Sequence, residues 1–368
     1  MRIAIDAYHA MFQSGGIPRY ARGLISAMAE HLASDELILF YNRFREKKEI
    51  WRPLGGRHTV REVRLPRTFL QGMWSSLNWP YIERFCGAVD VYHGLHFVLP
   101  PVERARRVLT IHDLTYLKFP NYFSDLSLNE RGYRRELPSA LTCADAVVAP
   151  SQKTRDDLIE HMKYPEDRAR VIYEGVDHQL FRPVKLEGAK PIWGLYGLTA
   201  PYLIYLVGTP EPRKNLNRTV EAAQIAAPDM PLVLIGPRPR LETLLGGNYG
   251  NLVFVGSVDD EHLPALLCGA TAALYPSLYE GFGLPVVEAM ACGTPVIAST
   301  RGALPEIAGG AALLVDPQNV AQIAEAILAV IEDKALQDHL REAGQRRAAD
   351  FSWQKTAAET LSLYRELL

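Results

Sequence analysis

Two glutamates in the C-terminal half of the chain, Glu280 and Glu288, have the residue type and the surroundings to bind hydroxyl groups. Glu280 falls in a glycine-rich turn after a short apolar run, and Pro285 suits the first turn of a helix that would carry Glu288. A carboxylate accepts paired hydroxyls well, while Gly281 and Gly283 would let backbone N–H groups reach a phosphate or a sugar. Glutamates at this spacing are also common as exposed ion-pair formers, so the spacing alone leaves both interpretations open.

Two neighbouring cations, Arg213 and Lys214, occur in the segment GTPEPRKNL, directly after the apolar run YLIYLVG. A turn at the end of a strand would hold them where they could neutralise a diphosphate leaving group without a metal ion. Glu211 precedes them in the same segment and could orient the pair. An arginine–lysine pair at a surface is just as often simply solvated, so the spacing does not decide between the two.

A glycine pair, Gly15 and Gly16, follows the first apolar run, RIAID, and precedes a helical pattern. Glycine lets the backbone come close to a ligand, and the N–H groups at the start of a helix near Ile17 would favour an anion such as phosphate. A turn of this kind is structural more often than functional. It therefore indicates a phosphate site only together with other signals.

The elements that would position these residues are strands and helices in alternation. Helical patterns separate short runs rich in valine and isoleucine: RIAID, ELILFYN, DVYHG, RRVLTIHDL, DAVVAPS, RVIYEGV, YLIYLVG, PLVLIG, NLVFVG, AALYPS and TPVIAS. This alternation predicts an α/β fold with parallel sheets covered by helices on both faces. Ligands of such sheets bind beyond the carboxyl ends of the strands, and each motif follows a predicted strand.

The length of 368 residues, with 48% hydrophobic and 22% charged residues, predicts a globular protein of two domains. The regular pattern pauses near residues 182–200, where proline and glycine gather. We therefore expect an N-terminal domain over residues 1–185 and a C-terminal domain over residues 186–351. A last helix over residues 352–368 could pack back on the first domain.

The chain shows no apolar stretch long enough to span a membrane and no signal-peptide pattern, which predicts a cytoplasmic protein. Its four cysteines are single, without metal-binding spacing, and are expected to be buried thiols. Basic residues crowd segment 43–67, and Trp74, Trp79 and Tyr81 follow closely. Residues 43–81 could dock on the anionic inner face of the plasma membrane or form a solvated loop with its own small core.

Taken in their order along the chain, these motifs resemble the GT-B glycosyltransferases, in particular the retaining enzymes of family 4. The resemblance covers nearly the whole chain: GG at 15–16, HD at 112–113, APS ending at Ser151, EGVD at 174–177, EPRKN at 211–215 and E-x7-E at 280–288. It implies two Rossmann-like domains that face each other across a cleft, with the acceptor on the N-terminal domain and a nucleotide-sugar donor on the C-terminal domain.

The resemblance also implies roles for single residues. Arg213 and Lys214 would bind the donor diphosphate, Glu280 would lie by the donor sugar, and Glu288 would bind the ribose hydroxyls. Gly16 would close over the phosphates from the opposite domain. Further contacts with the nucleotide sugar are expected from Gly15, Gly208, Val255, Ser257, Gly281, Phe282, Gly283 and Leu284.

His112, at the end of the run LTIHDL, matches the active-site histidine of the family, which hydrogen-bonds the donor sugar. A lone histidine is usually a satisfied core residue, but the HD pair at this place favours the site, and Asp113 would orient the ring. Ser151 matches a polar position at the head of the helix SQKTRDDL, where we expect an N-cap rather than a catalytic group.

The resemblance implies transfer with retention by a front-face route, in which the leaving diphosphate helps to accept the acceptor's proton. Glu280 as a covalent nucleophile is the alternative. No DxD motif of the kind that holds a metal in other glycosyltransferases occurs, so we expect neither a cofactor nor a need for a divalent ion.

The wording of GTPEPRKN and HDLTY is most similar to bacterial mannosyltransferases that use GDP-mannose to build polysaccharide or O-antigen units on a lipid carrier. The expected partners are therefore a nucleotide sugar and a saccharide or lipid-linked acceptor, and no nucleic acid. A UDP-sugar or dTDP-sugar donor stays open, as do a sugar-nucleotide epimerase of similar fold and a non-catalytic subunit.

Overall fold

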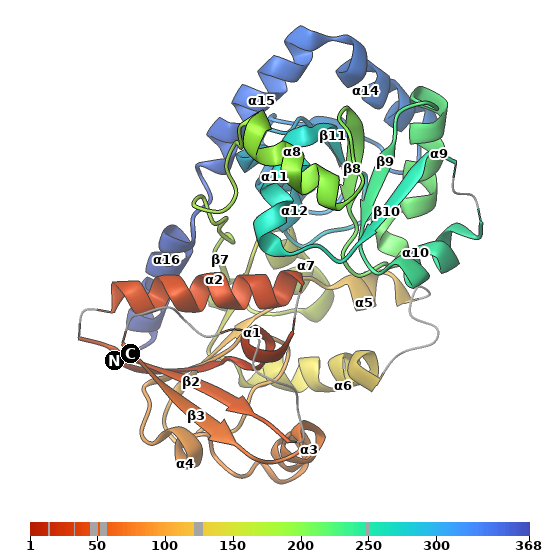
Figure 1. The fold of residues 1–368 in the computed structure, drawn as a ribbon. Coiled ribbons are helices and arrows are strands. Elements are labelled where there is room, and N and C mark those ends of the chain that lie inside the picture. The colour runs from red at the N-terminus through yellow and green to blue at the C-terminus, as the bar shows by residue number, and fades with distance from the viewer. Residues whose placement is uncertain (14, 33, 45–50, 52–56, 121–127, 248–249) are drawn as a thin grey trace. The chain divides into compact units, whose positions relative to one another are not determined.

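The computed structural model describes the chain except for residues 14, 33, 45–50, 52–56, 121–127 and 248–249 (Figure 1). The chain divides into two compact units: unit 1 comprises Met1–Gly175 and Trp353–Leu368, and unit 2 comprises Val176–Ser352. The first and last residues of unit 2, Val176 and Ser352, pair in an isolated parallel bridge.

Unit 1 is built on a parallel sheet of seven described strands in the order β3-β2-β1-β4-β5-β6-β7. The strands are β1 (Arg2–Asp6), β2 (Glu36–Asn42), β3 (His58–Val63), β4 (Val91–Gly94), β5 (Arg106–Thr110), β6 (Ala146–Ala149) and β7 (Ala169–Val171). Central strands such as β4 and β6 are buried throughout, as their continuous apolar runs require of a sheet covered on both faces. The strand order reverses between β1 and β4, the place where ligands of such sheets bind.

Helices cover the sheet of unit 1. They are α1 (Tyr8–Phe12), α2 (Gly16–His31), α3 (Arg67–Leu77), α4 (Glu83–Cys86), α5 (Thr115–Lys118), α6 (Leu128–Cys143), α7 (Gln152–Met162), the 3-10 helix η2 (Glu166–Arg168) and α16 (Trp353–Leu367). One apolar core cluster lies around Ile38, Leu70 and Ile82, and another lies around Leu109, Leu141 and Leu158.

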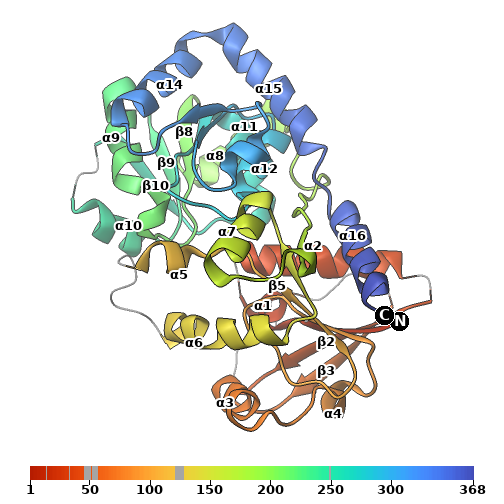
Figure 2. The same ribbon diagram turned by 180° about the vertical axis from the view of Figure 1, so that it is seen from behind.

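The last helix, α16, lies along α2, so the end of the chain packs back on unit 1 (Figures 1 and 2). Gly23 makes this approach possible, because a Cβ atom there would lie 2.1 Å from Cε2 of Trp353. His93 Nδ1 lies 2.5 Å from Tyr364 Oη, and His93 Nε2 lies 2.8 Å from Thr110 Oγ1. Burial lowers the pKa of His93 to about 3, so a neutral ring links α16 to the sheet.

Unit 2 is built on a second parallel sheet, of six described strands in the order β10-β9-β8-β11-β12-β13. The strands are β8 (Tyr202–Leu206), β9 (Leu232–Ile235), β10 (Leu252–Gly256), β11 (Ala270–Tyr275), β12 (Val296–Ser299) and β13 (Leu313–Val315). The strand order reverses between β8 and β11. Two parallel sheets with helices confirm the predicted α/β fold of two Rossmann-like parts.

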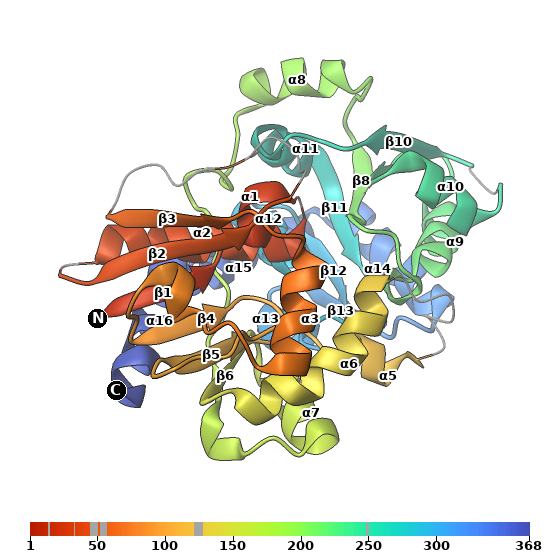
Figure 3. The same ribbon diagram turned by 90° about the horizontal axis from the view of Figure 1, so that it is seen from below.

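The helices of unit 2 are α8 (Leu186–Leu195), α9 (Leu216–Ala226), α10 (Arg238–Leu245), α11 (Leu263–Gly269), α12 (Leu284–Ala291), α13 (Leu304–Ala308), α14 (Val320–Glu332) and α15 (Lys334–Ala348), with the 3-10 helices η3 (Pro212–Lys214) and η4 (Asp260–His262). α14 lies beside α9 in all three views (Figures 1, 2 and 3). Figure 3 shows α8 at the outer end of this unit, where it packs on α11.

The division of the chain differs from the predicted boundary at 185/186. The segment after Gly175 already pairs with the end of unit 2, because His178 Nε2 donates to the carbonyl of Phe351 at 2.9 Å. The proline- and glycine-rich stretch that suggested a linker contains helix α8. That helix is held because the Trp193 indole N–H donates to the carbonyl of Ala265 at 2.8 Å. Composition alone was therefore a poor guide to the boundary.

Candidate active site

Four charged side chains meet in unit 2 at the point where the strand order reverses. η3, which follows β8, carries Arg213 and Lys214, and the loop after β11 carries Glu280. Arg213 Nη1 donates to Glu280 Oε2 at 2.6 Å, and Lys214 Nζ donates to Glu280 Oε1 at 2.7 Å. Glu211 Oε2 accepts from Arg213 Nε at 2.5 Å. The EPRKN and E-x7-E motifs thus come together in one charge cluster, formed by Glu211, Arg213, Lys214 and Glu280.

Backbone and amide hydrogen bonds hold the two loops of the charge cluster against each other. Leu278 N donates to the carbonyl of Arg213 at 2.7 Å, and Asn215 Nδ2 donates to the carbonyl of Pro276 at 2.9 Å. Asn215 adopts a left-handed conformation with φ 58°, which ends η3 and begins α9. The turn after β8 is therefore fixed by the loop after β11 as well as by its own sequence.

A third loop approaches Glu280 at Gly302, which follows β12. Its φ of +65° is one that glycine adopts readily, and a Cβ atom there would lie 2.7 Å from both N and O of Glu280. Ala303 N then donates to the carbonyl of Glu280 at 2.9 Å. Glycine at this position lets the backbone come close enough to fix Glu280.

The pKa of Glu280 results from two opposing effects. Burial favours the neutral acid, but the charges and hydrogen bonds of Arg213 and Lys214 outweigh burial and lower the pKa from 4.5 to about 2. The Glu280 side chain is 14% exposed, so this charge still reaches the surface of the unit. Glu280 is ionised at neutral pH, which suits a positioning or charge-stabilising group and excludes a general acid.

The second glutamate of the E-x7-E motif, Glu288, lies on α12, and its side chain is only 1% exposed. Gly283, with φ 102°, precedes α12, and Pro285 occupies its first turn as predicted. Gly281 and Leu284 are buried, and the ring of Phe282 packs edge-on against Phe351. A ribose-binding role for Glu288 stays a prediction, since the structure covers its carboxylate almost completely.

Three other predicted donor contacts also lie at carboxyl ends of strands in unit 2. Gly208 follows β8 with φ 63°, and a Cβ atom there would meet nothing within 4 Å. Val255 lies near the end of β10, and Ser257 follows that strand with its side chain exposed. Their positions agree with a ligand site at this edge of the sheet, and their contacts with a nucleotide stay predictions.

In unit 1, His112 follows β5 and is held from both sides. Its Nε2 donates to the carbonyl of Leu95 at 3.1 Å, its Nδ1 lies 3.3 Å from Glu174 Oε1, and its ring packs edge-on against Tyr20. Glu174 is 5% exposed, so its carboxylate is directed at the histidine from inside the unit. Both ring nitrogens face oxygen atoms, which fixes the orientation of the ring.

The nitrogens of His112 contact Glu174 and the carbonyl of Leu95, two partners that the sequence did not predict, and the predicted role of Asp113 in orienting the ring stays a prediction. Asp113 Oδ1 accepts from Thr115 N at 2.9 Å and so shapes the turn into α5. The sequence contained Glu174 in the motif EGVD but gave no reason to pair it with His112. Only the neighbouring positions of β5 and β6, with β7 beyond, bring the two residues together.

A group of side chains near His112 was missed in the sequence. The rings of His9 and His96 lie 4.7 Å apart, and His9 Nδ1 donates to Gln13 Oε1 at 2.7 Å. Burial and the charge of Arg67 lower the pKa of His9 to about 4, so its ring is neutral and Nε2 accepts from Arg67 Nη2 at 3.5 Å. The sequence did contain a sign of this group, because a histidine follows each of the first and third apolar runs.

Comparison with known proteins gives the family of both units. Residues 198–347 match glycosyl transferases group 1, and residues 14–180 match glycosyltransferase family 4. The O-antigen chain mannosyltransferase B of Escherichia coli is 33% identical over 288 residues, which are 75% of this chain and 74% of that protein. The chain belongs to glycosyltransferase family 4.

Further similarities extend this result to the fold of the glycosyltransferase. The MMP alpha-(1->4)-mannosyltransferase of Mycolicibacterium hassiacum is 33% identical over 244 residues, 64% of this chain and 55% of that protein. The structure of sucrose-phosphate synthase from Thermosynechococcus elongatus matches with a TM-score of 0.79 at 25% identity, over 100% of this chain and 99% of that chain. The predicted GT-B fold is confirmed.

The remaining predicted residues of the glycosyltransferase lie at helix starts in unit 1. Ser151 caps α7, since its Oγ accepts from Thr154 N at 3.1 Å, and the predicted N-cap is confirmed. α2 begins at Gly16, with Gly15 before it at φ 120°. A Cβ atom at either glycine would meet nothing within 4 Å, so the backbone there is open to approach. Phosphate binding at this helix start stays a prediction.

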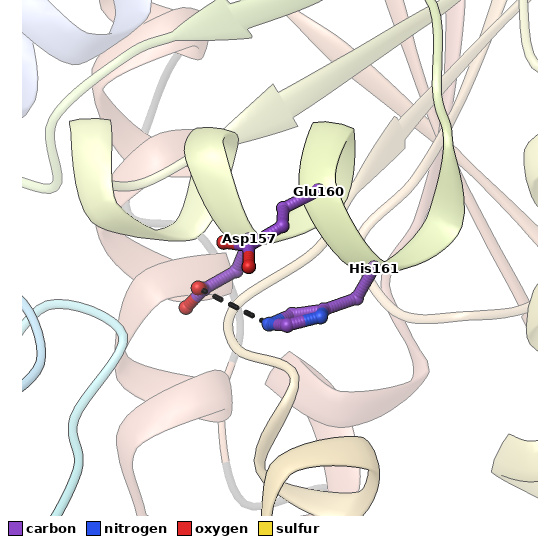
Figure 4. A group of neighbouring side chains, drawn as sticks. All are labelled: Asp157, Glu160 and His161. Carbon is purple, nitrogen blue, oxygen red and sulfur yellow. Dashed lines mark ion pairs between the residues drawn. The ribbon is translucent and has the colours of Figure 1, made fainter.

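One group of potential metal ligands occurs among the described residues, on α7 (Figure 4): Asp157, Glu160 and His161. Asp157 is buried, and its Oδ1 accepts from Lys118 Nζ at 2.6 Å and from Lys153 Nζ at 2.7 Å. Figure 4 shows the ion pair between Asp157 and His161, whose Nε2 lies 3.8 Å from the same oxygen. Since two ammonium groups already hold this oxygen, the group is part of an ion-pair network that joins α5 to α7.

The basic and aromatic segment 43–81 is described only in part, because residues 45–50 and 52–56 lie outside the described residues. Trp74 is partly buried, with its indole N–H donating to the carbonyl of Pro80 at 3.0 Å. The large hydrophobic side chains exposed in this segment are Phe44, Val60, Phe69, Leu77, Trp79 and Tyr81. Within the described part of the chain, no helix combines the length and the apolar character needed to cross a membrane.

Proposed function

We propose that this glycosyltransferase moves mannose from GDP-mannose, with retention of configuration, onto a saccharide or lipid-linked acceptor in polysaccharide or O-antigen biosynthesis. The observation that carries the proposal is the match to the O-antigen chain mannosyltransferase B of Escherichia coli over three quarters of the chain. A second relative at the same identity, the MMP alpha-(1->4)-mannosyltransferase, also names mannose as the transferred sugar.

The charge cluster of unit 2 has the chemistry that departure of a nucleoside diphosphate requires. Negative charge builds up on the diphosphate as the glycosidic bond breaks, and Arg213 and Lys214 are positioned cations that would stabilise it. Lys214 carries three donors, of which Glu280 accepts one. The ionised Glu280 would accept hydroxyls of the donor sugar and stabilise positive charge that develops at the sugar ring.

The nucleotide is tested by thermal unfolding with GDP, UDP, ADP and dTDP and with the corresponding sugar nucleotides. A ligand present at 100 times its dissociation constant stabilises the protein by about 2.7 kcal/mol, which is readily measured. We expect the largest shift with GDP and GDP-mannose. A larger shift with UDP or dTDP ligands would replace the donor, and no shift with any nucleotide would overturn the proposal.

Retention and metal independence are tested on the reaction product. Anomeric proton–carbon coupling in the product is expected to show the α configuration of the donor, whereas a β product would exclude retention. We also propose that turnover needs no divalent ion, because Arg213 and Lys214 can supply the charge that a metal would otherwise provide. Loss of turnover in excess chelator, with recovery on adding magnesium, would contradict this.

We propose in addition that unit 1 contacts the inner face of the plasma membrane through the exposed hydrophobic side chains of segment 43–81. Phe69 and Leu77 on α3 and Trp79 after it are large and exposed. The guanidinium carbon of Arg84 lies 5.8 Å from the Trp79 ring centre. Aromatic side chains with neighbouring cations are typical of surfaces that bind anionic lipid.

Sedimentation with lipid vesicles tests the membrane contact. The full-length protein is expected to bind vesicles of anionic phosphatidylglycerol at low salt and to bind neutral phosphatidylcholine vesicles less. The double variant Phe69→Ser, Leu77→Ser should lose most of this binding. A matched change of the exposed Ile225 in unit 2 to Ser should not. Equal binding to both vesicle types, or none, would exclude the anionic surface.

A further inference from the structure

Hydrogen bonds between four side chains of unit 1 connect the last helix, α16, to helix α2. Tyr364 Oη on α16 lies 2.5 Å from His93 Nδ1 on β4, and His93 Nε2 lies 2.8 Å from Thr110 Oγ1 on β5. Thr110 Oγ1 also lies 3.1 Å from the hydroxyl of Tyr20 on α2. We call these four residues, Tyr364, His93, Thr110 and Tyr20, the buried network. It joins two helices across two strands of the sheet.

The buried network is shielded from water and carries no charge. Each of its four side chains is at most 1% exposed. Burial lowers the pKa of His93 to about 3, so the imidazole is neutral. Burial and the charge of Glu174 raise the pKa of Tyr20, so the phenol stays protonated. A buried polar group is costly to leave unpaired, and the hydrogen bonds therefore hold these side chains in one arrangement.

Tyr20 connects the buried network to the predicted active-site histidine. Its ring packs edge-on against the ring of His112, with the ring centres 4.8 Å apart and 84° between the planes. Trp353, at the start of α16, packs on Tyr20 as well, with the ring centres 5.9 Å apart. Tyr20 is thus fixed through its hydroxyl by the network and through its ring by α16.

The hydrogen bonds of His112 do not hold its ring tightly by themselves. Its Nε2 lies 3.1 Å from the carbonyl oxygen of Leu95, and its Nδ1 lies 3.3 Å from Glu174 Oε1. Both distances exceed the usual value of about 2.9 Å for such bonds, so they leave the ring room to tilt. The T-shaped contact with Tyr20 restricts this tilt, because aromatic rings prefer that geometry over neighbouring ones.

Tyr20 therefore stands where it can transmit the fixed arrangement of the buried network to the imidazole of His112. An active-site group that is misplaced by about 1 Å can cost about 100-fold in rate, so residues that only hold such a group still affect turnover. We propose that Tyr20 is a positioning residue for His112, and that the buried network fixes Tyr20 from α16. This rests on the proposed function, with His112 in the active site of the transferase.

The first test removes the Tyr20 hydroxyl, because Tyr20→Phe keeps the ring and its shape. We expect kcat to fall about tenfold and the KM for the donor to change less than about twofold, since the His112 ring is held less firmly. The matched control is Tyr164→Phe, which removes another buried phenol of unit 1, whose hydroxyl donates to the carbonyl of Ala144. Both variants should lose thermal stability, but only Tyr20→Phe should lose turnover. Equal kcat in the two variants would overturn the inference.

The second test acts at the other end of the buried network, on α16. Tyr364→Phe leaves His93 Nδ1 without its hydroxyl partner and should lower kcat about threefold. In Tyr20→Phe the same change should have no further effect on kcat, because the hydroxyl that receives the restraint is already absent. The values of kcat for the unsubstituted protein, both single variants and the double variant measure this. Losses that multiply in the double variant would show that the network does not act on Tyr20.

A spectroscopic measurement without substrate separates this inference from the proposed function. In protein with ¹⁵N-labelled histidine, the ring signals of His112 are assigned by their loss in His112→Gln. We expect them to shift in Tyr20→Phe and Tyr364→Phe and to stay in place in Tyr164→Phe. If GDP-mannose supports no turnover, the proposed donor fails, but these shifts would still establish that the network positions His112. If GDP-mannose is used and the signals do not shift, only the positioning role fails.

Discussion

The two units place very different chemistry at the ends of their strands. In unit 2 the charge cluster consists of two carboxylates and two cations, and Arg213 and Lys214 lower the pKa of Glu280 to about 2 against the effect of burial. In unit 1 the histidines His9, His93 and His96 are held neutral by burial. The strand ends of unit 2 thus carry charged groups, and those of unit 1 carry neutral histidine rings.

The chemistry of sugar transfer from a nucleotide gives a physical reason for this contrast between the units. The bond that breaks leaves a diphosphate with growing negative charge, so fixed cations are needed at that end. The incoming group is a neutral hydroxyl, and a strong net charge near it would favour the wrong ligand. In unit 2 the free-energy cost of burying ions is offset by their pairing. Removal of one partner would leave a buried charge without compensation, and this would destabilise the protein far more than the pair itself stabilises it.

The largest expected effect is on turnover when the charge cluster loses its central carboxylate. Glu280→Gln keeps the shape but removes the charge that Arg213 and Lys214 share, so we expect turnover to fall about 100- to 1,000-fold. Initial rates with saturating donor and acceptor measure this. The matched control is Glu211→Gln, which removes a more exposed partner of Arg213 alone and should cost less than about tenfold. Equal losses in both variants would mean that overall charge balance matters and the position of Glu280 does not.

Lowering the pH should destabilise unit 1 before unit 2. Each of the two groups concerned contributes about 3 kcal/mol to the free energy of unfolding, which is lost when the group is protonated. The pKa of His9 falls from 6.5 to about 4 on folding, chiefly by burial and then by Arg67. Its contribution to stability is therefore complete above pH 6.5 and is lost as pH falls toward 4. The pKa of Glu280 falls from 4.5 to about 2, so its contribution is complete above pH 4.5 and is lost only toward pH 2.

Hydrogen exchange with mass spectrometry at pH 7 and pH 5 measures this separation, after correction for the intrinsic exchange rate. At pH 5 the strands of unit 1 should have lost protection, whereas β8 and β11 of unit 2 should keep theirs. His9→Gln removes the titrating ring and should reduce the loss in unit 1. If unit 2 loses protection first, the assignment of neutral and ionic chemistry to the two units is wrong.

Sequence reasoning predicted the parts of the active site that are local. The turn of Arg213 and Lys214 follows an apolar strand, and Pro285 begins the helix of Glu288, because turn and cap signals act over a few residues. The fold class followed for the same reason, since alternation of strand and helix patterns is local and recurs along the chain.

The pairings between motifs could not be read from the sequence. Glu280 holds Arg213 across 67 positions, and Glu174 reaches His112 across 62 positions. Such contacts depend on the order of strands in the sheet, which local patterns do not determine. The same limit hid His9 and Arg67, which are 58 positions apart and meet only because β1 and α3 lie side by side in unit 1.

A smaller effect is expected from the carboxylate that positions His112. Glu174→Gln should lower kcat about 10- to 100-fold while the KM for the donor changes little, because the ring loses the charged partner of Nδ1. Asp113→Asn is the matched control, since Asp113 supports a turn and asparagine can do the same. Steady-state kinetics of both variants decide between the two acids. A greater loss in Asp113→Asn would restore the role expected from the sequence.

The smallest effect is expected for substitutions of Ser151 in unit 1. They test whether its hydroxyl caps a helix or takes part in catalysis. Its hydroxyl accepts from Thr154 N and its side chain is fully buried, so Ser151→Ala should lower stability by about 1 kcal/mol through loss of the N-cap. Ser151→Gly should recover most of this, because glycine is tolerated at an N-cap. Neither variant has a hydroxyl, so a catalytic hydroxyl would make both lose turnover alike. We expect thermal unfolding to distinguish the two variants, and turnover of both at 25 °C to equal that of the unsubstituted protein.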